Sequence, residues 1–357
     1  MRLVERLGEL WQYRELVYNL VIRDLKARYK NSILGVAWSW LNPLMMMGVY
    51  TVVFNVLAGR SGIPDYPVFL LSALLPWNLF ANSVAEATNS IVQSAPLVKK
   101  VYFPREVLPI SVVLGNAVNL VISLPVFFGL ALAMGRPISG WVLLLPVTLL
   151  VQIAFTLGVG FITATLNVFY RDTYLIMNVL LTAWFFLTPI FYPITTVPEQ
   201  YVLWGITFNP RVWLRRLNPM ASIIASYQDL LYWGAPTGWD FFLRTAVTSV
   251  GVLVVGYLIF LRYSGRFGEE ALAHLRRIRR RWLSFTSTPM RAAQRCTSAL
   301  KISRRTRSSV VLLMATHQHV HQTLHHFGQV LLNPVTPQHL VRRLLCTAHR
   351  LPDRRPP

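Results

Sequence analysis

At 357 residues, with 54% hydrophobic and only 14% charged residues and a mean hydropathy of +0.44, the chain is too apolar for an ordinary soluble domain. Its apolar residues fall into uninterrupted runs. Because a charge at the centre of a bilayer costs roughly 2.5–3.5 kcal/mol, such runs indicate membrane-spanning helices.

The N-terminal region, residues 1–31, combines apolar residues at roughly helical spacing with Arg, Glu and Gln between them. Its position directly before an apolar run favours an amphipathic helix lying in the cytoplasmic membrane interface. A soluble helix packed on the protein itself would give the same pattern. The interface residues predicted in this helix are Arg23, Lys26, Arg28 and Tyr29.

Six apolar runs follow within residues 32–270, each long or nearly long enough for a bilayer, which needs about 20 helical residues. The predicted fold class is therefore an all-α integral membrane protein with six transmembrane helices. The predicted spans are Ile33–Ala58, Val68–Ala85, Val107–Met134, Trp141–Tyr170, Tyr174–Ile194 and Thr245–Leu261.

Some residues inside these spans have predicted structural roles. Pro43 is expected to kink the first span without ending it, because neighbours in a membrane protein can satisfy the carbonyl that proline leaves free. Asn116 and Asn119 in the third span are interpreted as packing residues. Gly158 and Gly160 in the fourth are expected to allow close helix approach.

Lys and Arg are distributed unequally between the two sides of the predicted spans. The side shared by the N-terminus and the even-numbered loops holds thirteen of them, and the other side holds six. Since positively charged loops stay in the cytoplasm, both termini are predicted to be cytoplasmic.

Two connecting segments are long. The cytoplasmic loop Glu86–Glu106 contains a cationic pair followed by a Phe-Pro-Arg-Glu sequence, a surface that suits a cytoplasmic partner. Composition alone favours the simpler interpretation that these cations only keep the loop on the cytoplasmic side. The exterior segment Thr195–Arg244 holds apolar pieces too short to span. These pieces predict re-entrant or interfacial helices before the last span.

The composition changes abruptly near residue 271. Residues 271–357 contain all eight His, both Cys and 16 of the 35 Lys and Arg, with Asp353 as the single acidic residue. One interpretation is a basic tail that binds anionic lipid or nucleic acid. The other is a disordered or non-native segment produced by read-through or a shifted frame, and the lack of any amphipathic period or nucleic-acid motif favours it. We expect no nucleic-acid partner and no metal site there.

Catalytic motifs are absent from the sequence. No GxxxxGK[ST], HExxH or GxSxG sequence occurs, so the chain has no phosphate-binding loop of its own. The spans hold hardly an ionisable residue, which argues against a proton- or sodium-coupled carrier. Energy for any uphill transport must therefore come from a partner.

Two segments together carry a family likeness. They are RDLKARYKNSILGVAWSWLNP, from Arg23 to Pro43, and PLVKKVYFPREVLPIS, from Pro96 to Ser111. They resemble the membrane subunits of ABC type-2 exporters, which move lipid-linked polysaccharides such as O antigens, capsules and teichoic acids. The likeness covers about Leu10 to Glu270, so residues 32–270 would be the six-helix ABC type-2 transmembrane domain.

The resemblance implies a permease subunit, not an enzyme, in the cytoplasmic (inner) membrane. It implies a homodimer with two copies of a separate ATP-binding subunit that holds ATP and Mg²⁺, no cofactor in this chain, and a lipid-linked polysaccharide as substrate. It also implies an ATPase contact within about Asn89–Glu106, gate helices within about Pro198–Asp240 and an aromatic channel. The ATPase-coupling residues would be Lys99, Lys100, Tyr102, Phe103, Pro104, Arg105 and Glu106. The channel-lining residues would be Trp77, Phe80, Trp184, Phe185 and Tyr192.

An alternative function is a membrane glycosyltransferase or polymerase that acts on polyprenyl-linked sugars. Such an enzyme needs accessible acidic residues for acid–base or metal chemistry. The exterior segments offer four scattered ones, Asp65, Glu199, Asp229 and Asp240. The sequence therefore favours the transporter.

Overall fold

The computed structural model describes residues 8, 10–30, 34–57, 62–94, 103–198, 200–203 and 206–267. The chain divides into two units, residues 1–278 and 279–357. The predicted tail, residues 271–357, lies outside the described residues.

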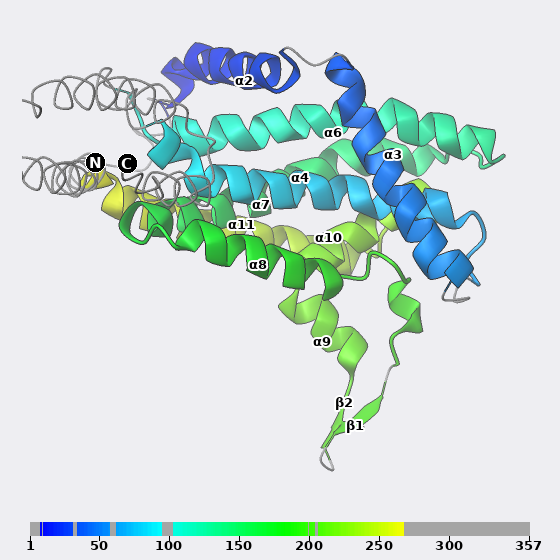
Figure 1. Cartoon of the computed structure of the whole chain (residues 1–357). Coiled ribbons are helices and arrows are strands. Elements are labelled where there is room, and N and C mark those ends of the chain that lie inside the picture. The colour runs from blue at the N-terminus through cyan, green and yellow to red at the C-terminus, as the bar shows by residue number, and fades with distance from the viewer. Residues whose placement is uncertain are drawn as a thin grey trace, which may run out of the picture. The chain divides into compact units, whose positions relative to one another are not determined.

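Helices make up most of the described part of the first unit (Figure 1). The helices long and apolar enough to cross a membrane, among the described residues, are α4 (Tyr66–Gln93), α6 (Val107–Ala133), η3 with α7 (Gly140–Leu144 and Leu145–Phe169) and α11 (Trp239–Ser264). A fifth apolar helix, α8 (Thr173–Phe186), has 14 residues. The shorter elements are α2 (Arg14–Tyr29), η1 (Gly35–Ala37), α3 (Trp38–Thr51), η2 (Val52–Leu57), η4 (Ile194–Thr196), α9 (Pro210–Leu217), α10 (Pro219–Gln228) and η5 (Asp229–Trp233).

Two predicted boundaries are wrong for the same reason. The second span was predicted to end at Ala85, but α4 continues through Glu86 to Gln93. The last was predicted to begin at Thr245, but α11 begins six residues earlier, at Trp239. Glu86 and Arg244 marked these two predicted ends, yet both lie inside their helices. Asp240 lies in the first turn of α11, where the helix dipole favours an acidic residue. Glu86 is paired with a cation from another helix.

The fifth predicted span also differs from the structure. It was expected to run to Ile194, but α8 ends at Phe186. Pro189 and Pro193 follow, and proline cannot continue a helix without losing a backbone hydrogen bond. Thr188, Ile190 and Phe191 are nevertheless buried, so this non-helical segment is packed inside the protein.

A short hairpin interrupts the otherwise helical fold of the described residues, which agrees with the predicted helical class. The strands β1 (Tyr201–Leu203) and β2 (Ile206–Phe208) pair antiparallel, with Tyr201 opposite Phe208. The hairpin leads into α9 within the predicted exterior segment.

The core is organised around α4, which runs between α6 and α8 in Figure 1 and packs against both. Nineteen of its 28 residues are buried, including Phe69 and Phe80. The predicted exterior segment contributes α10, which packs against α4, α7 and α11 and buries Met220, Ile224 and Tyr227. The predicted exterior segment therefore supplies part of the hydrophobic core.

Pro43 lies inside α3, as expected, and does not end that helix. A proline at this position leaves the carbonyl four residues earlier without its helical donor. That carbonyl belongs to Ser39, and the Ser123 hydroxyl of α6 donates a hydrogen bond to it at 3.1 Å. The neighbouring helix thus satisfies the carbonyl that Pro43 leaves free.

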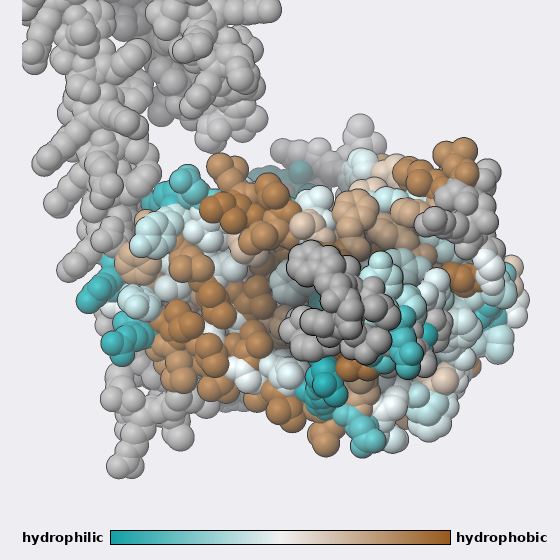
Figure 2. All heavy atoms as spheres, turned by 90° about the horizontal axis from the view of Figure 1, so that it is seen from below, coloured by the Kyte–Doolittle hydropathy of each residue, from teal (hydrophilic) through white to brown (hydrophobic). Residues whose placement is uncertain are grey.

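The surface carries a broad hydrophobic area, seen from below in Figure 2. Both α8 and α11 expose apolar side chains along their length, including Leu175, Val179, Leu243 and Val247, each more than 60% exposed. Exposed apolar area of this extent marks contact with lipid or with another protein. The finding agrees with a membrane-embedded protein.

Candidate functional site

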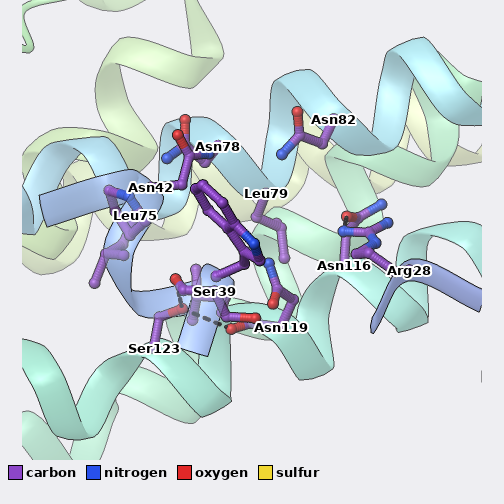
Figure 3. Close-up of a pocket in the computed structure, with 13 residues that line it drawn as sticks. Arg28, Ser39, Asn42, Leu75, Asn78, Leu79, Asn82, Asn116, Asn119 and Ser123 are labelled. Atoms are coloured by element: carbon purple, nitrogen blue, oxygen red, sulfur yellow. Dashed lines mark hydrogen bonds between the residues drawn. The ribbon is translucent and has the colours of Figure 1, made fainter. Parts of the chain in front are cut away.

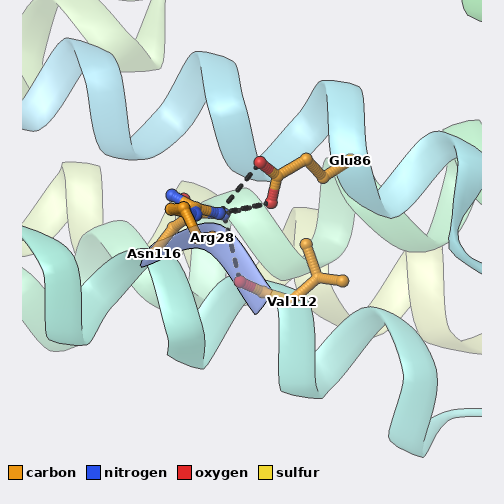
Figure 4. A network of polar contacts seen from close by, with 4 residues as sticks. All are labelled: Arg28, Glu86, Val112 and Asn116. Atoms are coloured by element: carbon orange, nitrogen blue, oxygen red, sulfur yellow. Dashed lines mark hydrogen bonds and ion pairs between the residues drawn. The ribbon is translucent and has the colours of Figure 1, made fainter. Parts of the chain in front are cut away.

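The N-terminal helix is anchored by one polar network (Figure 4). The guanidinium of Arg28 on α2 donates to both carboxylate oxygens of Glu86 on α4, at 2.9 and 3.0 Å, and to Oδ1 of Asn116 on α6, at 3.0 Å. The Asn116 amide in turn donates to Glu86 Oε2 at 2.9 Å and to the Val112 carbonyl at 3.1 Å. Three elements far apart in the sequence are joined at this point.

The other predicted residues of this helix are placed differently. Arg23 and Lys26 are exposed, and Arg23 pairs with its neighbour Asp24 at 2.8 Å. The side chain of Tyr29 lies outside what the structure describes. The helix packs on α6 and buries Leu20 and Val21, while Trp11 and Tyr18 are exposed. Exposed aromatic residues suit a membrane interface, which stays a prediction.

The predicted ATPase-coupling segment is described only from residue 103 onward; Lys99, Lys100 and Tyr102 lie outside the described residues. Phe103 is buried in a cluster that includes Val107 and Phe267, Pro104 is half-buried, and Glu106 is 3% exposed. Arg105 donates a hydrogen bond from Nη1 to the carbonyl of Ser264. The end of the loop is therefore attached to the end of α11.

Four of the five predicted channel residues lie together. The Trp77 ring centre lies 5.6 Å from that of Phe80 and 5.4 Å from that of Phe185, and Phe80 lies 5.0 Å from Trp184. Trp77, Phe80 and Phe185 are buried and Trp184 is half-buried. Within one chain these aromatic residues pack on one another, and their predicted role in lining a channel stays a prediction.

A second aromatic group was missed by the sequence reasoning. Phe191 lies 5.0 Å from Tyr50, 4.4 Å from Phe54 and 5.1 Å from Phe185, measured between ring centres. This group borders a cavity of about 780 Å³, and the fifth predicted residue, Tyr192, also lines it. Tyr50 and Phe54 stand four residues apart in a run with few other aromatic residues. This spacing places them on one face of a helix, so the sequence alone could have indicated the group.

A polar cavity of about 300 Å³ lies where α2, α3, α4 and α6 meet (Figure 3). Its polar lining consists of Arg28, Ser39, Asn42, Asn78, Asn82, Asn116, Asn119 and Ser123. Asn116 and Asn119 were interpreted as packing residues, and Asn116 does bridge helices. The other three asparagines were not considered, although Asn78 and Asn82 stand four residues apart in an apolar run.

A cluster around Arg136 fastens the turns before α4 and after α6. Arg136 Nε donates to Asp65 at 2.7 Å, its Nη1 donates to the Tyr232 carbonyl at 3.2 Å, and its Cζ lies 4.0 Å from the Tyr232 ring centre. Burial raises the pKa of the Tyr232 hydroxyl above its ordinary value, while the positive charge of Arg136 acts in the opposite direction.

The part of the chain that the structure describes shows no metal-binding or catalytic group of residues. No group of three or more His, Cys, Asp or Glu residues there is arranged to hold a metal ion. What these residues form is a helical membrane protein with polar and aromatic cavities between its helices.

Comparison with known sequences supplies the family. Residues 15–232 match the ABC-2 type transporter family, and the chain belongs to this family of transporter membrane proteins. It is 39% identical over 268 residues to the O-antigen export system permease protein RfbA of Myxococcus xanthus, a match that covers 75% of this chain and all of that relative. A protein of the same name from Klebsiella pneumoniae is 34% identical over 264 residues, covering 74% of this chain and 96% of the relative.

A more distant relative is the polysialic acid transport protein KpsM of Escherichia coli. It is 25% identical over 208 residues, which cover 56% of this chain and 78% of that protein. The family recognised from the segments Arg23–Pro43 and Pro96–Ser111 is therefore confirmed.

Proposed function

We propose that this chain is the permease subunit of an ABC exporter that moves a lipid-linked, O-antigen-like polysaccharide across the cytoplasmic membrane. The observation that carries this proposal is the 39% identity to an O-antigen export permease along that relative's whole length. The relatives reported above are transport proteins by name, which favours a transporter over the glycosyltransferase alternative.

The proposed energy source is ATP hydrolysis in a separate subunit. The sequence contains no phosphate-binding loop, so ATP and Mg²⁺ would bind to that partner. The segment Phe103–Glu106 is the proposed place of mechanical coupling, supported by the bond from Arg105 to the Ser264 carbonyl at the end of α11. Movement of this loop would pull directly on the last helix.

The proposed topology has six spans with both termini in the cytoplasm. Together α3 and η2 cover residues 38–57, and 20 helical residues at about 1.5 Å each match a hydrocarbon core of about 30 Å. The 14 residues of α8 are too few alone. The buried segment after it, with Thr188, Ile190 and Phe191, would complete the fifth crossing, because irregular backbone is tolerated in a membrane where protein surrounds it.

The proposed assembly is a homodimer with two ATP-binding subunits. The exposed apolar side chains of α8 offer area for a second copy or for lipid. The proposed gate helices are α9 and α10, and the burial of Met220 and Tyr227 among α4, α7 and α11 supports a return of this segment into the membrane.

The test is export in cells. A strain that synthesises the lipid-linked glycan but lacks its exporter receives this chain together with the ATP-binding subunit from its own genome. Glycan on the cell surface is the expected result, and a partner with its P-loop lysine replaced is the control that abolishes it. Intracellular accumulation of glycan with both intact subunits present would contradict the proposed function.

A further inference from the structure

Four helices converge on one polar cavity, called here the amide cavity, whose walls carry five asparagines, Asn42, Asn78, Asn82, Asn116 and Asn119. Its volume of about 300 Å³ is at the lower end of the range in which proteins hold small ligands. Figure 3 shows side chains of α3, α4 and α6 turned toward this common space. The cavity lies apart from the aromatic clusters described above.

Three of these amides have no hydrogen-bond partner within the described part of the chain. They are Asn42 on α3 and Asn78 and Asn82 on α4, and no hydrogen bond is found for any of them, whereas Asn116 is bonded to Glu86 and Val112. Asn78 is half-buried, whereas Asn42 and Asn82 are exposed, so their donors and acceptors are open to the cavity. Donors and acceptors that face one shared space and are not used within the protein are available to a polar occupant.

The chemistry of the lining favours a neutral, hydroxyl-bearing occupant. Each asparagine side chain offers two N–H donors and one carbonyl acceptor, which match hydroxyl groups that both donate and accept. Trp38, 44% exposed, also lines the cavity and adds an apolar ring surface. Amide groups combined with an aromatic face suit a sugar ring, whose hydroxyl edge is polar and whose C–H face is apolar.

The charges at the cavity argue against an anion. Arg28 is the cation of the lining, and its guanidinium donates to both oxygens of Glu86 and to Asn116. A phosphate would have to compete with the Glu86 carboxylate for these donors and would lie near its negative charge. A sugar ring meets neither obstacle.

We propose that the amide cavity binds a sugar ring of the exported glycan. This inference rests on the proposed function and adds to it a carbohydrate site made by α3, α4 and α6, separate from the aromatic groups. The glycan would pass this site as part of its path through the protein.

Cysteine labelling in cells tests the proposal. Cys296 and Cys346 are the only cysteines of the chain, so replacing both by serine gives a cysteine-free background. Asn78→Cys and Asn82→Cys then each place one thiol in the cavity, and Ile138→Cys in the turn after α6, 48% exposed and outside the cavity lining, is the control. The rate of N-ethylmaleimide labelling is compared between cells that make the lipid-linked glycan and cells in which the first sugar transfer to the carrier is disabled.

The expected result is labelling of the two cavity thiols about fivefold slower in glycan-producing cells, with no change at the control, because an occupied site excludes the reagent. Equal rates in both strains would mean that lipid or water fills the cavity and would overturn the proposal. Slow labelling in both strains would mean that another protein surface closes the cavity, and would overturn it too.

A second variant separates this inference from the proposed function. Asn78→Leu keeps the side-chain size and removes the amide. Export should fall about fivefold at equal protein level, because a fivefold loss corresponds to the free energy of roughly one hydrogen bond. Asn178→Leu is the matched control, since that amide donates to the Tyr174 carbonyl of its own helix. Suppose that the wild type exports, that glycan does not slow the labelling of the cavity thiols, and that Asn78→Leu exports as well as the wild type. Then only the cavity proposal fails. If the wild type does not export, the proposed function fails, and protection of the cavity thiols by glycan would still support binding.

Discussion

Gly158 of α7 and Gly256 of α11 are in direct backbone contact. A Cβ placed on Gly256 would lie 2.2 Å from the Gly158 carbonyl oxygen, and one placed on Gly158 would lie 2.6 Å from backbone atoms of Val252 and Leu253. No side chain fits between these helices at this point. Small residues at such crossings let membrane helices approach closely, as the sequence predicted for Gly158.

Gly256→Ala should therefore destabilise the protein. The added methyl group meets backbone, which cannot move aside cheaply, so a loss of about 1–3 kcal/mol or more is expected. The measurement is the thermal unfolding midpoint of the purified chain in detergent. Gly251→Ala in the same helix is the control, because a Cβ there has nothing within 4 Å; equal midpoints for the two variants would contradict the close crossing.

The anchor of the N-terminal helix should show measurable coupling between Arg28 and Glu86. The Glu86 side chain is 45% exposed, so solvent screening limits the expected coupling to about 0.2–1 kcal/mol. A double-mutant cycle with Arg28→Ala and Glu86→Ala measures it through the unfolding free energy. Hydrogen exchange of α2 should rise in both single variants.

Asp24→Asn is the control for this anchor. Asp24 pairs only with the adjacent Arg23 among the contacts described, and the two side chains are 34% and 57% exposed. Exchange in α2 should therefore stay unchanged. If Asp24→Asn released the helix as much as Glu86→Ala, general surface charge rather than the Arg28 network would hold it.

The sequence predicted helix boundaries correctly where they depend only on residues within that helix. The third predicted span, Val107–Met134, differs from α6 by one residue, because an unbroken apolar run needs no partner to be recognised. It failed at Glu86, which was taken as the end of a span. The cation that pairs with Glu86 lies 58 residues away, and only tertiary packing brings Arg28 to it.

The same limit explains the candidate site. Asn42, Asn78 and Asn116 are isolated polar residues in three separate apolar runs, and the sequence alone gives no reason to group them. The packing of α3 and α6 on α4 creates their common cavity. The predicted coupling segment rests on the family likeness alone and stays a prediction, and Lys99 and Lys100 lie outside the described residues.

The cluster around Arg136 should depend on arginine and not merely on positive charge. Arg136 bonds to Asp65 and to the Tyr232 carbonyl and stacks on the Tyr232 ring, and the lysine ammonium cannot reproduce this planar set of donors. Arg136→Lys should lower the unfolding midpoint and expose the turn before α4 to protease. Arg244→Lys, at an exposed arginine, should have no effect. A tolerant Arg136→Lys variant would show that a single charge at this position is sufficient.

The bond from Arg105 to the Ser264 carbonyl leads to a prediction about energy coupling. If this bond passes the movement of the loop to α11, Arg105→Ala should leave ATP hydrolysis by the partner subunit intact and reduce export. One charge-assisted hydrogen bond has a value of about 1.5–3 kcal/mol, so the expected loss of export per ATP is about tenfold or more. Export and hydrolysis are measured together in vesicles that contain both subunits.

Arg262→Ala, at an exposed arginine near the same end of α11, is the matched control and should preserve the ratio of export to hydrolysis. A parallel loss of hydrolysis and export in Arg105→Ala would mean that the residue is needed for assembly with the ATPase, and an unchanged ratio would mean that the movement reaches α11 by another route.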